Sequence, residues 1–224
     1  MVIDNQASLA WDSLAPGWLQ GGQRIASPNC DARPADARPE LIVIHNISLP
    51  PNEFGGDGVV QLFTNQLDPQ AHPFYAEIAH LRVSAHFFIR RTGVLYQFVS
   101  VDERAWHAGV SAFCGRERCN DFSVGIELEG TDTQPYTEAQ YAQLTELLTA
   151  LCQCYPIQAI TGHEHIAPGR KTDPGPAFDW SRIHQWQAQW QTQLQAQSET
   201  LGGKAALFTA GVKSHVQIFS HICI

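Results

Sequence analysis

The segment Leu41-Ile-Val-Ile-His45-Asn46 decides the kind of fold. Four consecutive apolar residues make both faces of a strand apolar, which is typical of a central strand covered on both sides. The polar pair at its carboxyl end would then lie where open α/β architectures place their functional groups. We therefore expect a layered domain with His45 and Asn46 at one end of its central sheet.

The segments that follow this strand predict more of the sheet. Two β-prone runs, Ser84–Arg90 and Val94–Val101, flank Thr92-Gly93 and predict a hairpin. The run Phe122–Glu129 predicts a further strand, and a short helix is expected near Val59 to Leu67. The sheet is thus assembled from segments that are distant in the sequence.

Two amphipathic helices are expected in the second half of the chain. Thr137 followed by Gln140 resembles a capping box, and apolar residues at three- and four-residue spacing continue to about residue 155. A second helix is predicted from Trp180 to Leu194, with an aromatic stripe that we expect to pack on the core. Between the helices we expect a short strand over Gln158–Gly162 and a loop over His163–Phe178.

Charge and composition exclude several classes of partner. The 224 residues include 14 Lys and Arg against 22 Asp and Glu, so the net charge is −8. A chain of this sign repels nucleic acid and anionic membranes, and we expect neither as a partner. No stretch reaches the roughly 18 apolar residues of a membrane helix, and the first residues lack the pattern of a secretory signal. We therefore expect a cytoplasmic protein, and in that compartment we expect its six cysteines to be reduced thiols.

The densest group of reactive side chains lies in the breaker-rich segment 161–175. The proline after Asp173 favours an extended backbone, so Lys171 and Asp173 would project to the same side. His163 and Asp173 are candidate metal ligands, and His45 could supply a third from the end of its strand. Three nitrogen and oxygen ligands are typical of a catalytic zinc site. The alternative for His45 is a hydrogen-bonded structural role.

Glu127 is the second candidate for chemistry. Strand alternation places Val124, Ile126 and Leu128 on one face and Glu127 and Glu129 on the other. A carboxylate beside a metal can act as a general base. The alternative is a pair of solvated carboxylates on an exposed sheet face.

Several long motifs, in order over about residues 18–185, resemble the AmpD amidases, which are 1,6-anhydro-N-acetylmuramyl-L-alanine amidases. Phage lysozyme-type amidases and peptidoglycan recognition proteins share the wider family. The motifs are Leu-Ile-Val-Ile-His45-Asn-Ile-Ser-Leu-Pro-Pro-Asn-Glu-Phe-Gly-Gly56, Ile-Ala-His-Leu-Arg82-Val-Ser-Ala-His86, Arg-Ala-Trp-His107-Ala-Gly109, Gly-Arg-Glu-Arg118-Cys-Asn-Asp-Phe-Ser-Val-Gly-Ile-Glu127-Leu-Glu-Gly-Thr-Asp132, Thr-Gly-His163 and Arg-Lys171-Thr-Asp173-Pro-Gly-Pro176.

The resemblance implies a single α/β domain, with a mixed central sheet flanked by helices and a zinc site at one end of the sheet. It implies one zinc ion per chain, and it carries three kinds of role onto this sequence. These are metal ligands at His45, His163 and Asp173, catalytic roles for Glu127 as general base and Lys171 as transition-state stabiliser, and contacts to the stem peptide at Asn46, Arg82 and Arg118. Surface ion pairs are the alternative for the two arginines. His165 departs from the family pattern and could compete for the metal.

The same resemblance implies hydrolysis of the amide between the lactyl group of (1,6-anhydro)-N-acetylmuramic acid and L-alanine, in the recycling of small muropeptides. The alternatives are an amidase for polymeric wall peptidoglycan and a non-catalytic peptidoglycan-binding module. We expect a monomer with an amidase domain over residues 1–195. Residues 196–224 have no recognised counterpart and are expected to be a poorly ordered extension or an edge strand.

Overall fold

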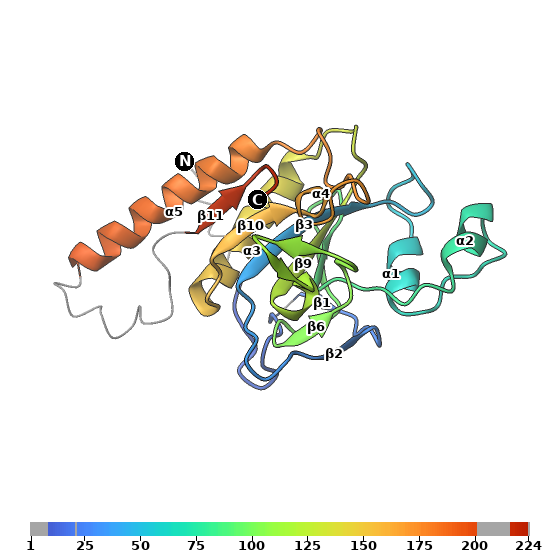
Figure 1. Ribbon diagram of the computed structural model, residues 1–224, viewed down its shortest axis with the longest axis horizontal. Helices are drawn as coiled ribbons and strands as arrows, with labels where there is room; N and C mark the ends of the chain where they lie inside the picture. The colour runs from blue at the N-terminus through green and yellow to red at the C-terminus, as the bar shows by residue number, and fades with distance from the viewer. Residues whose placement is uncertain (1–8, 21, 201–215, 224) are drawn as a thin grey trace.

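A mixed sheet of seven strands forms the centre of the protein in a computed structural model, which describes residues 9–20, 22–200 and 216–223 (Figure 1). The strand order is β1-β5-β4-β9-β3-β10-β11. Its strands are β1 (Gln23–Arg24), β3 (Leu41–Ile47), β4 (Phe87–Ile89), β5 (Leu95–Gln97), β9 (Ser123–Glu129), β10 (Ala159–Gly162) and β11 (Gln217–Phe219). Strands β4, β9, β3 and β10 run parallel, and β4 pairs antiparallel with β5 in the predicted hairpin. The expected α/β fold with a mixed sheet is confirmed.

Within the described residues, two small sheets and six helical segments surround this centre. The small sheets pair β2 (Cys30–Ala32) with β6 (Glu103–Ala105) and β7 (Ala112–Phe113) with β8 (Arg116–Glu117). The helical segments are α1 (Gly58–Phe63), α2 (Pro73–Ile78), the 3-10 turn η1 (Cys119–Asp121), α3 (Glu138–Cys154), α4 (His163–Ile166) and α5 (Trp180–Thr200). In Figure 1, α3 and α5 lie toward one end of the molecule, and α1 and α2 lie toward the other. Among the described residues, no helix is both long and apolar enough to cross a membrane.

Side chains at alternate positions of β3 and β9 lie on opposite faces of the central sheet. Ile42, Ile44, Val124, Ile126 and Leu128 are fully buried in one cluster with the apolar faces of α3 and α5. Burial of each such side chain contributes about 2 kcal/mol, so this face anchors both central strands. The intervening residues of the two strands point to the opposite face.

Helix α3 begins where the capping pattern predicts it. Thr137 Oγ1 accepts a hydrogen bond from the Gln140 amide at 3.1 Å, and Gln140 Oε1 accepts one from the Thr137 amide at 3.1 Å. The Gln140 side chain also donates to the Glu129 carbonyl oxygen at 3.0 Å. The capping box therefore fixes the start of α3 against the end of β9.

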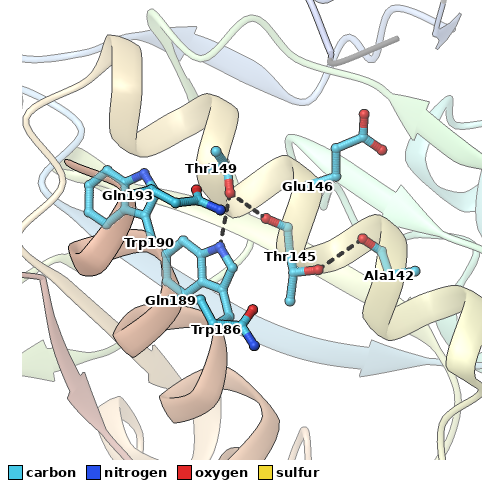
Figure 2. Close-up of a pocket in the computed structure, with 8 residues that line it drawn as sticks. All are labelled: Ala142, Thr145, Glu146, Thr149, Trp186, Gln189, Trp190 and Gln193. Atoms are coloured by element: carbon cyan, nitrogen blue, oxygen red, sulfur yellow. Dashed lines mark hydrogen bonds between the residues drawn. The ribbon is translucent and has the colours of Figure 1, made fainter. Parts of the chain in front are cut away.

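The aromatic stripe of helix α5 packs on the core, as predicted, and it also contacts α3. Trp186 and Trp190 are buried in the main core, and Trp186 Nε1 donates to Thr149 Oγ1 at 2.9 Å (Figure 2). The hollow between the two helices in Figure 2 is lined by these tryptophans and by Thr145, Glu146 and neighbouring polar residues. It holds no cluster of groups suited to acid–base or metal chemistry.

The segment predicted as a loop after β10 begins with a helical turn. Residues His163–Ile166 form α4, and the Ala167 amide donates to the His163 carbonyl at 3.0 Å. The loop prediction was wrong for these four residues because the breakers, Pro168 and Gly169, lie after the turn rather than within it. The turn carries His163 at its first position.

The C-terminal segment adds the seventh strand. β11 pairs in parallel with β10, with Ile218 opposite Ile160, which corresponds to the edge-strand alternative. Residues 201–215 lie outside the described residues. Cys223 then forms a disulfide with Cys114, between Cα atoms 5.0 Å apart and 109 residues apart in sequence. The prediction of six reduced thiols was therefore wrong for this pair, because β11 carries Cys223 to the β7–β8 hairpin, a proximity that no local spacing reveals.

Candidate metal centre and active site

Three side chains converge at the carboxyl ends of β3 and β10. Gly162 pairs with Ile44 across the two strands, so the next residues, His163 and His45, come to lie side by side. The Nδ1 atoms of His45 and His163 and Oδ2 of Asp173 each lie 3.0 Å from the other two. These three residues are the one group in the described part of the chain that could hold a metal ion.

The far side of the His163 ring shows that its Nδ1 lone pair faces the centre of this triangle. His163 Nε2 lies 3.1 Å from the Ala108 carbonyl oxygen, which can only accept a hydrogen bond. That nitrogen therefore carries the proton and leaves Nδ1 as an acceptor. Asp173 Oδ2 is also an acceptor. Acceptors 3.0 Å apart repel one another unless a cation lies between them, so the residues fit a bound metal ion.

Burial and mutual contacts set the charge states of the candidate ligands. His45 is 1% exposed, and burial together with the charge of His163 lowers its pKa to about 4. Burial alone would raise the pKa of Asp173, but its close contacts with His163 and His45 hold it well below the ordinary value for an aspartate. At neutral pH the site thus offers a neutral imidazole and an ionised carboxylate, the forms that bind metals.

Glu127 lies next to this triangle. It pairs directly with His45 across β9 and β3, so its side chain leaves the sheet on the same face. The residue is 8% exposed, and its Oε2 has no hydrogen-bond partner in the described structure. Burial, and next the charge of Asp173, raise the pKa of Glu127 well above its ordinary value. The alternative of a solvated carboxylate pair is therefore wrong.

A cavity of about 400 Å³ opens beside the triangle. The three candidate ligands, Glu127 and the exposed Lys171 are among its polar lining residues. Its apolar lining residues include Leu49, Leu62, Phe63, Phe74 and Ile78, which belong to one apolar cluster. A polar reaction centre therefore adjoins a surface suited to the apolar parts of a substrate.

Comparison with known proteins agrees with this geometry. The family model of N-acetylmuramoyl-L-alanine amidases matches residues 35–176. The 1,6-anhydro-N-acetylmuramyl-L-alanine amidase AmpD of Escherichia coli is 65% identical over 172 residues, which cover 76% of this chain and 94% of the relative.

Solved structures show the same fold. A crystal structure of an AmpD derivative is 58% identical with a TM-score of 0.74, covering 77% of this chain and 97% of the other. The amidase AmiD of Escherichia coli, solved with anhydro-N-acetylmuramic acid-L-Ala-D-γ-Glu-L-Lys, is 28% identical with a TM-score of 0.50, covering 80% of this chain and 65% of the other.

The chain belongs to the N-acetylmuramoyl-L-alanine amidase family.

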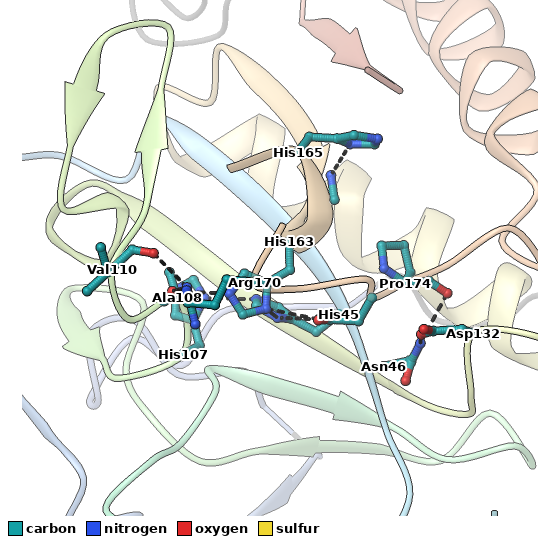
Figure 3. A network of polar contacts seen from close by, with 12 residues as sticks. His45, Asn46, His107, Ala108, Val110, Asp132, His163, His165, Arg170 and Pro174 are labelled. Atoms are coloured by element: carbon teal, nitrogen blue, oxygen red, sulfur yellow. Dashed lines mark hydrogen bonds and ion pairs between the residues drawn. The ribbon is translucent and has the colours of Figure 1, made fainter. Parts of the chain in front are cut away.

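In this amidase, Asn46 lines the cavity and also fixes the loop that carries the candidate ligand Asp173. Its Nδ2 donates to Asp132 Oδ1 at 2.8 Å and to the Pro174 carbonyl at 3.1 Å (Figure 3). The Tyr136 hydroxyl donates to the same carbonyl at 2.8 Å. These bonds hold the peptide that follows Asp173, so Asn46 has a structural task besides the predicted contact to substrate.

Neither arginine predicted to contact substrate is among the residues that line the amidase cavity. Arg82 is exposed and donates to carbonyls at the end of α2, including that of Ala79 at 3.3 Å. Arg118 is exposed and pairs with Asp121 at 3.1 Å. Arg118 therefore forms the kind of surface ion pair given as its alternative, whereas Arg82 bonds backbone carbonyls. Contact with substrate stays a prediction for both arginines.

Two further histidines of the amidase differ from what the sequence suggested. His165 Nδ1 accepts a hydrogen bond from the Gly162 amide at 3.2 Å, and the residue is not one of the three that converge. His107, which the sequence reasoning did not assign, lies in the cavity wall with Nδ1 2.9 Å from His45 Nε2 (Figure 3). No spacing pattern links His107 to His45, and only its presence in a family motif marked it.

Proposed function

We propose that this amidase holds one zinc ion at His45, His163 and Asp173 and hydrolyses the amide between the lactyl group of N-acetylmuramic acid and L-alanine. The observation that carries the proposal is the convergence of three possible metal-binding atoms beside a buried carboxyl group whose Oε2 has no hydrogen-bond partner in the described structure. Two imidazoles and one carboxylate are a donor set that zinc accepts, and three protein ligands leave a position open for chemistry.

The roles of the chain's own residues follow from their chemistry. Bound zinc supplies Lewis acidity, which activates water and polarises a carbonyl group. Glu127 takes a proton from the attacking water and returns it to the departing amine of L-alanine. Burial raises its pKa and so makes the carboxylate a stronger base, which suits the acceptance of a proton from water. Lys171 donates to the carbonyl oxygen as negative charge develops there.

We propose small anhydro-muramyl peptides as the substrates, cleaved in the cytoplasm by a monomer during recycling. The AmpD relative is named for the 1,6-anhydro sugar, which marks the end of a released fragment rather than the interior of a polymer. The apolar part of the cavity lining can accept the sugar and the methyl groups beside the scissile bond. We assign the amidase domain to residues 1–195 and treat residues 196–224 as an extension.

The test is hydrolysis of a purified anhydro-muramyl tripeptide, followed by mass spectrometry of the released peptide. The zinc-loaded protein should release free peptide, a chelator should abolish release, and added zinc should restore it. Intact polymeric peptidoglycan is the matched second substrate. Release from the polymer at an equal rate would contradict the substrate class, and no release from either substrate would contradict the proposed function.

A further inference from the structure

His107 contacts a candidate metal ligand from behind. Its Nδ1 lies 2.9 Å from Nε2 of His45, on the side of the His45 ring that faces away from the ligand triangle. The two rings meet edge to face at 90°, with centroids 5.0 Å apart. His107 Nε2 in turn lies 3.1 Å from Ser123 Oγ. A chain of three polar groups therefore runs from β9 to the metal ligand.

The positions of the protons along this chain follow from the ligand triangle. His45 Nδ1 faces two acceptors at 3.0 Å and serves as a ligand only with its lone pair free. A neutral imidazole with a free Nδ1 carries its proton on Nε2. His45 Nε2 must then donate to His107 Nδ1, and His107 must carry its own proton on Nε2 and donate to Ser123. Each group in the chain thus specifies the tautomer of the next.

The backbone of β9 holds the His107 ring in place. A Cβ atom at Gly125 would lie 2.5 Å from Cγ of His107, so the ring packs directly on the backbone where a side chain would stand. The Ala108 carbonyl, one residue later, accepts from the other histidine ligand. The segment His107-Ala108 therefore contacts Nε2 of both His45 and His163.

We propose that His107 is a positioning residue that selects the metal-binding tautomer and the ring orientation of His45. The inference rests on the metal site of the proposed function, but on no step of the hydrolysis. Groups that accept a hydrogen bond from a metal-bound imidazole raise its basicity and fix its orientation, and their loss commonly weakens metal binding by about 10- to 100-fold.

The test compares two substitutions at the same position. H107F keeps a ring against Gly125 but removes the acceptor, whereas H107N places an amide oxygen near the position of Nδ1. Zinc affinity is measured by competition with a chromophoric chelator. We expect H107F to raise the Kd by about 10- to 100-fold and H107N to recover most of that loss. The control H165N makes the same change at the histidine beside the site and should leave the Kd unchanged.

Nuclear magnetic resonance of ¹⁵N-histidine-labelled, zinc-loaded protein supplies a readout that a general packing role would not move. The Nε2 proton of His45 should be hydrogen-bonded and slow to exchange with water in wild type and H107N, and fast to exchange in H107F. If H107F fails to fold, S123A is the second variant. It removes only the hydroxyl group that His107 contacts and should raise the Kd for zinc roughly two- to tenfold.

The outcomes separate this inference from the proposed function. Equal zinc affinity in wild type and H107F, or no recovery in H107N, would overturn the role of His107 and leave the amidase proposal standing. Wild-type protein that binds zinc but releases no peptide would overturn the amidase proposal alone, because neither the affinity nor the spectrum requires substrate.

Discussion

Glu127 and Glu129 leave the same face of β9 and are nearly equally buried, at 8% and 4% exposed, yet their surroundings differ. Glu129 accepts hydrogen bonds from the amides of Gly55 at 2.6 Å and Arg91 at 2.9 Å, and Arg90 lies 3.8 Å away. Glu127 faces the cavity, and its Oε2 has no partner among the described residues.

Strand β9 therefore carries one buried carboxylate with hydrogen-bond partners and one with a free oxygen atom. A buried carboxylate whose oxygens are occupied by backbone amides stabilises the loop that supplies those amides. A buried carboxyl group with a free oxygen has a raised pKa and can exchange a proton. We therefore assign Glu129 to structure and Glu127 to chemistry, and the following substitutions test that division.

Replacing Glu127 should have the largest effect on activity. E127Q keeps the shape of the side chain and removes the base, so kcat should fall by about 10²- to 10⁴-fold. Zinc content and the unfolding midpoint should stay at or above wild-type values. Steady-state kinetics with metal analysis check this prediction, and activity within a fewfold of wild type in the zinc-loaded variant would refute the assigned role.

Replacing Lys171 should have the next largest effect. K171M keeps most of the chain length and removes the cation that lies in the cavity beside Glu127. The loss of one stabilising donor should lower kcat by about 10²- to 10³-fold with a smaller change in KM. A matched substitution at an exposed arginine that is neither in the cavity nor a predicted substrate contact, R116M, is the control. An effect of K171M on KM alone would show that Lys171 binds substrate rather than the transition state.

Replacing Glu129 should act on stability rather than on chemistry. E129Q leaves the Gly55 and Arg91 amides and the Arg90 guanidinium without a charged acceptor, which should cost about 2–3 kcal/mol of unfolding free energy. The expected change in kcat is only a fewfold. Urea unfolding of E129Q and E127Q side by side checks the contrast, and equal stability losses in both would contradict it.

The dependence of stability on pH should show the smallest effect. The folded protein keeps a proton on Glu127 above pH 4.5, its ordinary pKa, because burial raises the pKa in the folded state. Between pH 4.5 and the raised pKa, the unfolded chain therefore binds fewer protons than the folded protein. The contribution of Glu127 to the free energy of unfolding is fully present below pH 4.5, and it falls by up to about 1.4 kcal/mol per pH unit until the pH passes the raised pKa. In metal-free protein, wild type should lose stability relative to E127Q as pH rises. Parallel curves would exclude a raised pKa.

Helices and strands that a single local sequence pattern predicts are present in the structure. The capping box at Thr137, the hairpin at Thr92-Gly93 and the apolar run of β3 each depend on neighbouring residues, and the structure contains all three. The helical turn that starts at His163 and the short helix α2 escaped because short elements take most of their stability from tertiary contacts rather than from propensity.

The candidate site shows the same division. The sequence position of His45 placed it near the end of a strand. The family motifs identified His163 and Asp173 as candidate metal ligands and Glu127 as the candidate general base. The cavity wall contains His107 but neither Arg82 nor Arg118. Which of these residues reaches the cavity depends on how the loops fold back over the sheet. Such contacts join residues far apart in the chain, and no spacing rule encodes them.

The amino-acid sequence by itself determined the alternation of faces on β3 and β9, because side chains on a strand point to opposite sides in turn. That alternation already placed Ile42 and Ile44 in the core and His45 on the other side. The register that sets His45 beside Glu127, the distances of 3.0 Å among the three candidate ligand atoms and the disulfide from Cys114 to Cys223 arise only in the folded protein. These depend on how separate segments pack together, which is a property of the folded chain as a whole.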